Sequence, residues 1–196
     1  MMKKTLRAAA LTAAMTTMLS GAAFAMATVT DGQETSDGAT LTYPVVKADA
    51  PEAQQRINMV IEADVKAFMQ EIDAARVAGK PPAAKMSYEI TKSSDELLSL
   101  KTEQFISEES AAHPMSYAHG YIFRLSDGKA LTLADVQQLP DRKEHASRYT
   151  LESLNKRLAE PKDGAAKNFK KLETTPKDIY MDANGHIHVL IQRYEA

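Results

Sequence analysis

PEAQQRINMVIEADVKAFMQEIDAARVA, residues 51–78, indicates a single long helix. Its large apolar side chains fall within about 80° of one another at 100° per residue, and they form one stripe made of Ile57, Ile61, Val65, Phe68 and Ile72. Asp49 is a typical N-cap residue, and Pro51 fits the first turn. The run Gly79-Lys80-Pro81-Pro82 is expected to end the helix. Because a single apolar face needs a partner, we expect this stripe to cover a β-sheet.

The segments on either side of the helix alternate apolar and polar residues, as β-strands do. Residues 41–46 precede the helix, and Pro44 favours an edge position for that strand. Residues 86–90 and 98–106 follow it and indicate an antiparallel pair. Residues 117–125 form a third extended run, which the tight-turn pair Asp127-Gly128 closes.

The C-terminal third indicates short helices and a hairpin. Thr132 and Asp135 have the spacing of a capping box, as do Asp141 and Glu144. The second box is expected to open a helix that ends at Pro161 and buries Leu151, Leu154 and Leu158. Residues 179–181 and 187–191 flank an Asn-Gly turn, which predicts a hairpin. The fold class is therefore α+β, a largely antiparallel sheet with one long and one or two shorter helices packed on one face.

The first 25 residues have the three parts of a secretory signal peptide in order. Lys3, Lys4 and Arg7 give a positive start, residues 8–19 are apolar, and Ala23-Phe24-Ala25 is a cleavage site of the A-x-A type. The apolar stretch is shorter than the roughly 20 residues that a spanning helix requires. We therefore expect cleavage near Ala25 and a bacterial protein that is periplasmic or secreted, with no membrane anchor.

After the signal peptide we expect a flexible leader at residues 26–39, because Thr, Gly, Asp and Ser dominate there. Residues 40–196 suit a single domain with its own core.

Charge and cysteine usage exclude several classes of partner and chemistry. The signal peptide holds three of the 24 basic residues and none of the 26 acidic ones, so the mature chain has 21 basic residues and a net charge of −5. This balance gives no general reason to bind nucleic acid, and it suits a cationic partner. The chain has no cysteine, which excludes a disulfide, a lipidated cysteine and a cysteine nucleophile.

The loop and strand between residues 108 and 121 are the first candidate for ligand contact, because they join two strands and mix charged, histidine and aromatic side chains. The candidate ligand-binding residues are Glu108, Glu109, His113, Met115, Tyr117, His119 and Tyr121. An acid/base or metal cluster and a loop that His113 fixes by hydrogen bonds are the alternatives.

His186 and His188 are candidates for a metal site, because they share one face of a predicted strand. No third ligand is evident nearby, and we expect no cofactor. The motifs G-x-S-x-G, G-x-G-x-x-G and H-E-x-x-H and the Walker phosphate loop do not occur. No catalytic residue is assigned, and the sequence favours a non-enzymatic protein.

Four stretches carry a resemblance to a known family: Tyr43-Pro44-Val45 before the long helix, Ser110-Ala111-Ala112-His113-Pro114 with Tyr117, residues 127–136, and residues 179–187 leading to Tyr194-Glu195. From Tyr43 onward the chain resembles the extracellular domain family of RsiV-type anti-sigma factors, which is also found as an accessory domain of peptidoglycan deacetylases. The resemblance implies an α+β fold and a partner of the lysozyme type, since these anti-sigma factors sense lysozyme.

The chain also departs from that family. Members usually have Gly-Gly where this chain has Ser110 and Ala111, and Asn where it has Met115. We expect neither the sigma-binding segment and membrane helix of an anti-sigma factor nor the catalytic domain of a deacetylase.

The sequence thus favours an exported envelope protein that binds a lysozyme-like protein or peptidoglycan fragments. Two alternatives stay open. One is a small metal-dependent hydrolase that acts on cell-wall material through His113, His119 or the pair His186 and His188. The other is an assembly or scaffold protein that uses the strand near Pro44 or the C-terminal strand. The oligomeric state is not fixed by the sequence.

Overall fold

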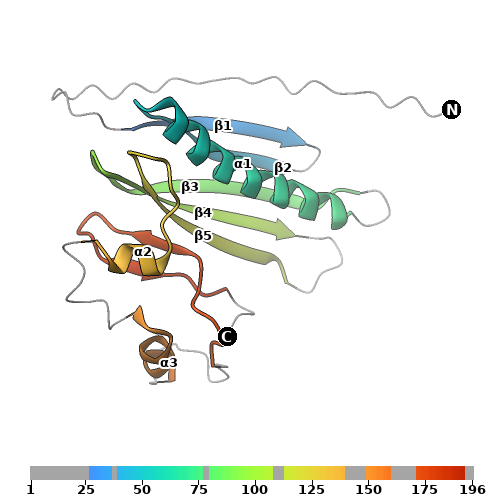
Figure 1. Cartoon of the computed structure of the whole chain (residues 1–196). Helices are drawn as coiled ribbons and strands as arrows, with labels where there is room; N and C mark the ends of the chain where they lie inside the picture. The colour runs from blue at the N-terminus through green and yellow to red at the C-terminus, as the bar shows by residue number, and fades with distance from the viewer. Residues whose placement is uncertain are drawn as a thin grey trace.

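The computed structural model describes residues 27–36, 39–76, 80–107, 113–139, 149–159 and 171–192. The elements in chain order are β1 (Thr28–Ser36), β2 (Ala39–Lys47), α1 (Pro51–Ala74), β3 (Ala83–Ser93), β4 (Leu97–Ser107), β5 (Met115–Arg124), α2 (Leu133–Gln137), α3 (Leu151–Ala159), β6 (Ile179–Met181) and β7 (Ile187–Val189). Figure 1 shows α1 lying across the larger sheet, with the β6–β7 hairpin, α2 and α3 gathered on the β5 side. In the described part of the chain, no helix combines the length and apolar character that a membrane span requires.

Among the described residues, the larger sheet has five strands in the order β1-β2-β3-β4-β5, so its strands follow the chain. All neighbours are antiparallel except β2 and β3, which run parallel over three residue pairs, from Ala39 with Ala84 to Leu41 with Met86. β6 and β7 form a separate antiparallel hairpin. The predicted α+β class with a largely antiparallel sheet is confirmed.

One face of the sheet is covered by α1 through the predicted apolar stripe. Every member of that stripe is buried, and Ile57, Ile61 and Phe68 are at most 1% exposed. They join a cluster that includes Met86 of β3 and Leu100 of β4. Full burial of one such side chain contributes about 1.5–3 kcal/mol, which explains why this stripe positions the helix.

A second apolar cluster lies on the opposite face of the sheet. Successive residues of a strand point to opposite faces, and on β5 Phe123 belongs to the α1 cluster while Ile122 belongs to the second one. The second cluster also contains Val136 of α2, Leu154 of α3 and Met181 of β6. The shorter helices, expected on the same face as the long helix, therefore pack with the hairpin on the other side.

Three local predictions are wrong. Residues 28–36 of the expected flexible leader form β1, which pairs with β2 along nine residue pairs. β2 is consequently not an edge strand, and Pro44 is tolerated there because pairing with β3 ends at Leu41. The N-cap of α1 is Ala50, which makes no side-chain cap hydrogen bond, rather than Asp49.

β1 is held partly by one contact across the sheet. The Tyr88 hydroxyl of β3 donates a hydrogen bond to Asp31 Oδ1 of β1 at 2.6 Å. Burial and this bond raise the pKa of Tyr88. β1 has little apolar surface of its own, and the hydrogen bond from Tyr88 therefore helps to hold it on the sheet.

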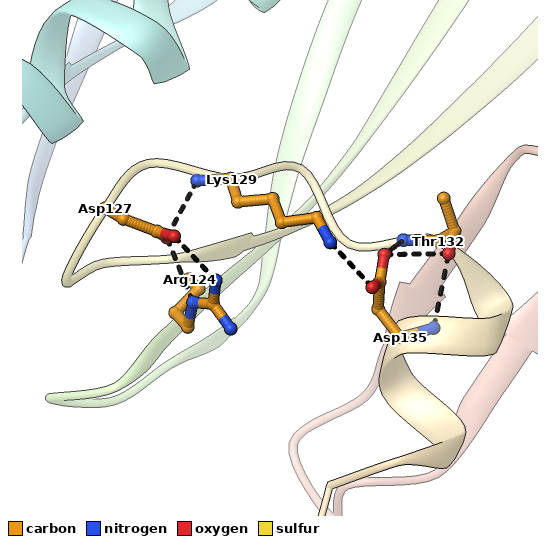
Figure 2. Close-up of polar contacts among 5 residues, drawn as sticks. All are labelled: Arg124, Asp127, Lys129, Thr132 and Asp135. Atoms are coloured by element: carbon orange, nitrogen blue, oxygen red, sulfur yellow. Dashed lines mark hydrogen bonds and ion pairs between the residues drawn. The ribbon is translucent and has the colours of Figure 1, made fainter.

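The turn after β5 follows the sequence prediction (Figure 2). Gly128 has φ +71°, and Asp127 accepts hydrogen bonds from Arg124 and from the backbone N–H of Lys129. The Arg124 bond lowers the pKa of Asp127 to about 2. Thr132 and Asp135 form the predicted capping box at the start of α2, and Lys129 Nζ lies 2.6 Å from Asp135 Oδ1.

Other predictions lie partly outside the described residues. The predicted helix is present as α3 but begins only at Leu151, and of its three leucines Leu154 is buried while Leu151 and Leu158 are half-buried. The signal peptide at residues 1–25, the capping box of Asp141 and Glu144, and the family stretch Tyr194-Glu195 fall outside the described part of the chain. The terminal hairpin is confirmed by β6 and β7.

Candidate functional site

Among the described residues, the sheet face opposite α1 is covered along only part of its length. Near the β3–β4 turn, Ser99 is fully buried beneath the hairpin, and its Oγ accepts a hydrogen bond from the backbone N–H of Met181 at 2.8 Å. Farther along β4 on the same face, Glu103 and Phe105 are exposed. The uncovered part is an open groove of about 630 Å³. We call it the sheet groove; it is lined by Lys85, Ser87, Glu103, Gln104, Phe105, Ser116, Tyr117, Ala118, Ile191 and Gln192.

The floor of the sheet groove is made of direct cross-strand neighbours. Phe105 pairs with Lys85 of β3 on one side and with Ser116 of β5 on the other. Glu103 pairs with Ser87 and Ala118 in the next row. A cation, a carboxylate, two hydroxyls and an aromatic ring that is 38% exposed therefore lie side by side on a rigid sheet.

One wall of the sheet groove comes from the C-terminal segment, which we define as residues 178–192. Gln192 binds the outer edge of β5 with both of its amide atoms, because its Oε1 accepts from the Ala118 N–H at 3.3 Å and its Nε2 donates to the Ala118 carbonyl at 2.5 Å. Leu190 N–H donates to the Asp178 carbonyl at 2.9 Å. The wall residues Ile191 and Gln192 are thus joined to Asp178 through the hairpin.

Gly120 lets the C-terminal segment approach the edge of β5. A Cβ at this position would lie 2.6 Å from the carbonyl carbon and 2.6 Å from the carbonyl oxygen of Ile179. Only a residue without a side chain fits such an approach of two backbones. The Gly120 N–H also donates to Asp178 Oδ1 at 3.4 Å.

His119 lies beside this junction, between two carboxylates. Its Nδ1 is 3.1 Å from Asp178 Oδ1, and its Nε2 is 3.8 Å from Asp64 Oδ1 of α1. The hydrogen bond with Asp178 raises the pKa of His119, burial opposes this shift, and the charges of Asp64 and Glu71 add to it. We call His119, Asp64 and Asp178 the His119 cluster; it joins α1, β5 and the C-terminal segment.

The neighbours of the His119 cluster are mostly buried polar groups. Gln104 of β4 donates from Nε2 to Asp64 Oδ1 at 3.0 Å. Tyr121 stacks on Phe123 with ring centroids 5.7 Å apart. Burial and the charge of Asp64 raise the pKa of Tyr121. Both ring nitrogens of His119 face carboxylates, so neither is directed at the sheet groove as a general base would be.

The predicted ligand-binding residues are only partly brought together. Met115, Tyr117, His119 and Tyr121 alternate along β5 and therefore share the face that α1 covers. Tyr117 also lines the sheet groove, and its hydroxyl donates to Met115 Sδ at 3.4 Å. His113 is exposed at the start of this segment. Glu108 and Glu109 lie outside the described residues.

His186 and His188 meet at one carboxylate. His186 Nδ1 lies 3.1 Å and His188 Nε2 lies 3.2 Å from the same oxygen, Asp182 Oδ2, and His188 stacks on Tyr180. Burial alone would raise the pKa of Asp182. The hydrogen bonds from His188 and His186 outweigh this effect, so the pKa of Asp182 is lowered. Within the described ranges, no group of three or more His, Asp or Glu side chains is arranged to hold a metal ion. The contacts of both rings with Asp182 join the two sides of the hairpin turn.

Several site residues were missed by the sequence reasoning. Phe105 and Lys85 have the ordinary alternation of a strand. Nothing in that pattern shows that the hairpin and the shorter helices leave this part of the sheet face exposed. Asp178 and Gln192 lie far along the chain from His119 and Ala118, which they contact. The one available signal was Gly120, an isolated glycine in a strand pattern, which suggests close approach of another backbone.

The fold and the groove define an α+β domain with a long helix on one sheet face and an open ligand-sized groove on the other. A solved structure of a DUF3298 family protein from Pseudomonas aeruginosa PAO1 is similar to the chain, with a TM-score of 0.43 and 11% sequence identity. The match covers 67% of this chain and 64% of that one. No protein-family model matches the chain, and no curated protein matches it.

Proposed function

We propose that the chain is an exported, non-enzymatic protein of the cell envelope that binds peptidoglycan fragments in the sheet groove. One observation carries the proposal. The sheet groove has a volume of about 630 Å³, within the usual range of roughly 300–1,000 Å³ for small-ligand sites, and it combines an exposed aromatic ring with charged and hydroxyl groups.

This lining suits a glycopeptide. Peptidoglycan fragments join sugars, which present hydroxyls and apolar ring faces, to short peptides that carry carboxylates and amines. Phe105 offers a flat apolar surface to a sugar ring. Lys85 and Glu103 offer the charges that complement the peptide ends, and Ser87 and Ser116 offer hydroxyls.

The non-enzymatic part of the proposal is supported by the state of the histidines. The ring nitrogens of His119 face Asp64 and Asp178, and His186 and His188 share Asp182. A general base needs a nitrogen within hydrogen-bond reach of the substrate. These rings instead join elements of the fold to one another.

A lysozyme-like cationic protein is the second candidate ligand, and the outer surface of α1 favours it. Between positions 51 and 74 the exposed charged residues are four acidic and two basic ones: Glu52, Glu62, Glu71, Asp73, Arg56 and Lys66. Such a surface attracts a cationic protein. The resemblance to RsiV-type extracellular domains supports the same partner.

The proposal is tested by calorimetric titration of the purified mature chain with a disaccharide-peptide fragment of peptidoglycan and, separately, with lysozyme. Phe105→Ala should weaken fragment binding about tenfold, which corresponds to about 1.4 kcal/mol, as expected for a central aromatic contact. Ile90→Ala is the matched control, because Ile90 is 45% exposed on β3 but does not line the sheet groove.

Equal fragment affinities for the two variants would refute binding in the sheet groove. Binding of lysozyme alone, weakened by charge reversal at Glu52 and Glu62, would replace the first candidate by the second. Failure of both ligands to bind would overturn the proposal. The export part is tested by mass spectrometry of protein recovered from the periplasm, which should begin after Ala25.

A further inference from the structure

The C-terminal wall of the sheet groove depends on a short series of contacts that ends at a histidine. Gln192 binds both backbone groups of Ala118 on the outer edge of β5, and Leu190 N–H donates to the Asp178 carbonyl. The Asp178 carboxylate then receives Gly120 N–H and contacts His119 Nδ1. These contacts connect the wall to the His119 ring through Asp178.

We propose that protonated His119 holds the C-terminal wall of the sheet groove in place, and that loss of this proton loosens the wall and weakens ligand binding. The ligand part of this inference rests on the proposed function, since it concerns regulation of the same groove. The wall part stands on the contacts of His119 and Asp178 alone.

The ionised groups that pack against His119 favour its charged form, and burial opposes it. α1 contributes the carboxylates of Asp64 and Glu71, and the C-terminal segment contributes Asp178. β4 contributes the uncharged Thr102 and Gln104, and β5 itself contributes Tyr121, which stays protonated because burial raises its pKa. Within the described part of the chain these ionised neighbours are all acidic, so the proton on the ring is stabilised by each of them.

The sign of the effect follows from the raised pKa of His119. An unfolded histidine has a pKa of about 6.5. The stabilising contribution is fully present below that pH and is lost as the pH rises through the higher pKa of the folded state. A neutral ring can still donate from Nδ1 to Asp178, but it no longer carries the charge that attracts the carboxylates of Asp178 and Asp64. The wall should therefore loosen on the alkaline side of neutrality.

Amide hydrogen exchange tests the wall without any ligand. The protection factor of Leu190 N–H, which donates to Asp178, should fall about tenfold between pH 6.0 and pH 8.5 in the wild-type chain. Leu131 N–H is the internal control, because it donates to Ile122 on the same edge of β5 but has no contact with the His119 cluster. Its protection should stay constant over the same range.

Two variants make the result specific. His119→Gln has no titratable proton, so Leu190 protection should not change with pH. Asp178→Asn keeps the shape and removes the charge, and it should give the loosened wall already at pH 6.0. Asp178→Asn still tests the inference if His119→Gln fails to fold. Constant Leu190 protection in the wild-type chain, or an equal fall in His119→Gln, would overturn the inference.

Titration of the peptidoglycan fragment at the two pH values completes the test. Binding should be at least fivefold weaker at pH 8.5, and this difference should vanish in His119→Gln. Equal affinity at both pH values would overturn the ligand part of the inference. Absence of binding at either pH would overturn the proposed function and this ligand part together, while the exchange data would still decide whether His119 controls the wall.

Discussion

Gly120→Ala should destabilise the protein by about 2–6 kcal/mol. The added methyl group would lie 2.6 Å from the Ile179 carbonyl carbon, so two backbones must separate. Overpacking of this kind costs about 1–3 kcal/mol. The displacement also pulls Met181 N–H away from the buried Ser99 Oγ, and a buried donor without a partner costs about 1–3 kcal/mol more. Urea unfolding monitored by circular dichroism measures the sum.

Gly32→Ala is the matched comparison. A Cβ on Gly32 would lie 2.4 Å from Cε2 and 2.6 Å from Cζ of Tyr43, which is at least as close as the Ile179 contacts at Gly120. The obstacle here is the far end of an aromatic ring, which can shift, and alanine is better than glycine inside a strand by roughly 0.5–1 kcal/mol. We expect a loss below about 1 kcal/mol.

The comparison separates a backbone contact at Gly120 from a side-chain contact at Gly32 that is at least as close. In Gly120→Ala, the amide signals of Ala118 and Leu190 should shift, whereas in Gly32→Ala the shifts should stay near Tyr43. Equal unfolding free energies for the two variants, or a larger loss in Gly32→Ala, would refute the reasoning that the β6 backbone is fixed against β5.

Two further predictions concern the turn between β5 and α2. Asp127→Asn should lower the midpoint of urea unfolding at pH 7 and lower it by much less at pH 2. The Arg124 contact lowers the pKa of Asp127 to about 2, so it stabilises the fold above a pH of about 3.8, and this stabilisation is lost as the pH falls through the folded pKa. An equal loss at both pH values would contradict this. Asp135→Ala should cost about 1 kcal/mol at pH 7 in the same assay, since it removes the capping box of α2, and Thr132→Ala should cost a similar amount; no loss in either variant would show that the box does not matter for stability.

The parts of the fold that depend on local periodicity could be predicted from the sequence. The stripe from Ile57 to Ile72 identified α1 and its buried face, and Asp127-Gly128 and Asn184-Gly185 marked both turns. These signals succeed because a helix stripe and a left-handed glycine depend on residues that are close in the chain.

β1 could not be predicted in this way. Its sequence contains little apolar surface, and what orders it is pairing with all of β2 and the bond from Tyr88 to Asp31, 57 positions away. The candidate site shows the same limitation. Tyr117 was found because it lies in a loop-strand region of mixed chemistry, whereas Phe105, Asp178 and Gln192 acquire their roles from contacts between distant segments.

The chain order of the strands has a consequence for how the molecule assembles. Because β1 to β5 pair with sequence neighbours, most pairings of the larger sheet close short loops, which lowers the entropic cost of forming them early. The C-terminal segment must return to β5 across more than 50 intervening positions, as Gln192 does to reach Ala118. We expect the sheet and α1 to form first during folding and the sheet groove to be completed last, so that a chain arrested late in folding would present the sheet with its groove still lacking a wall.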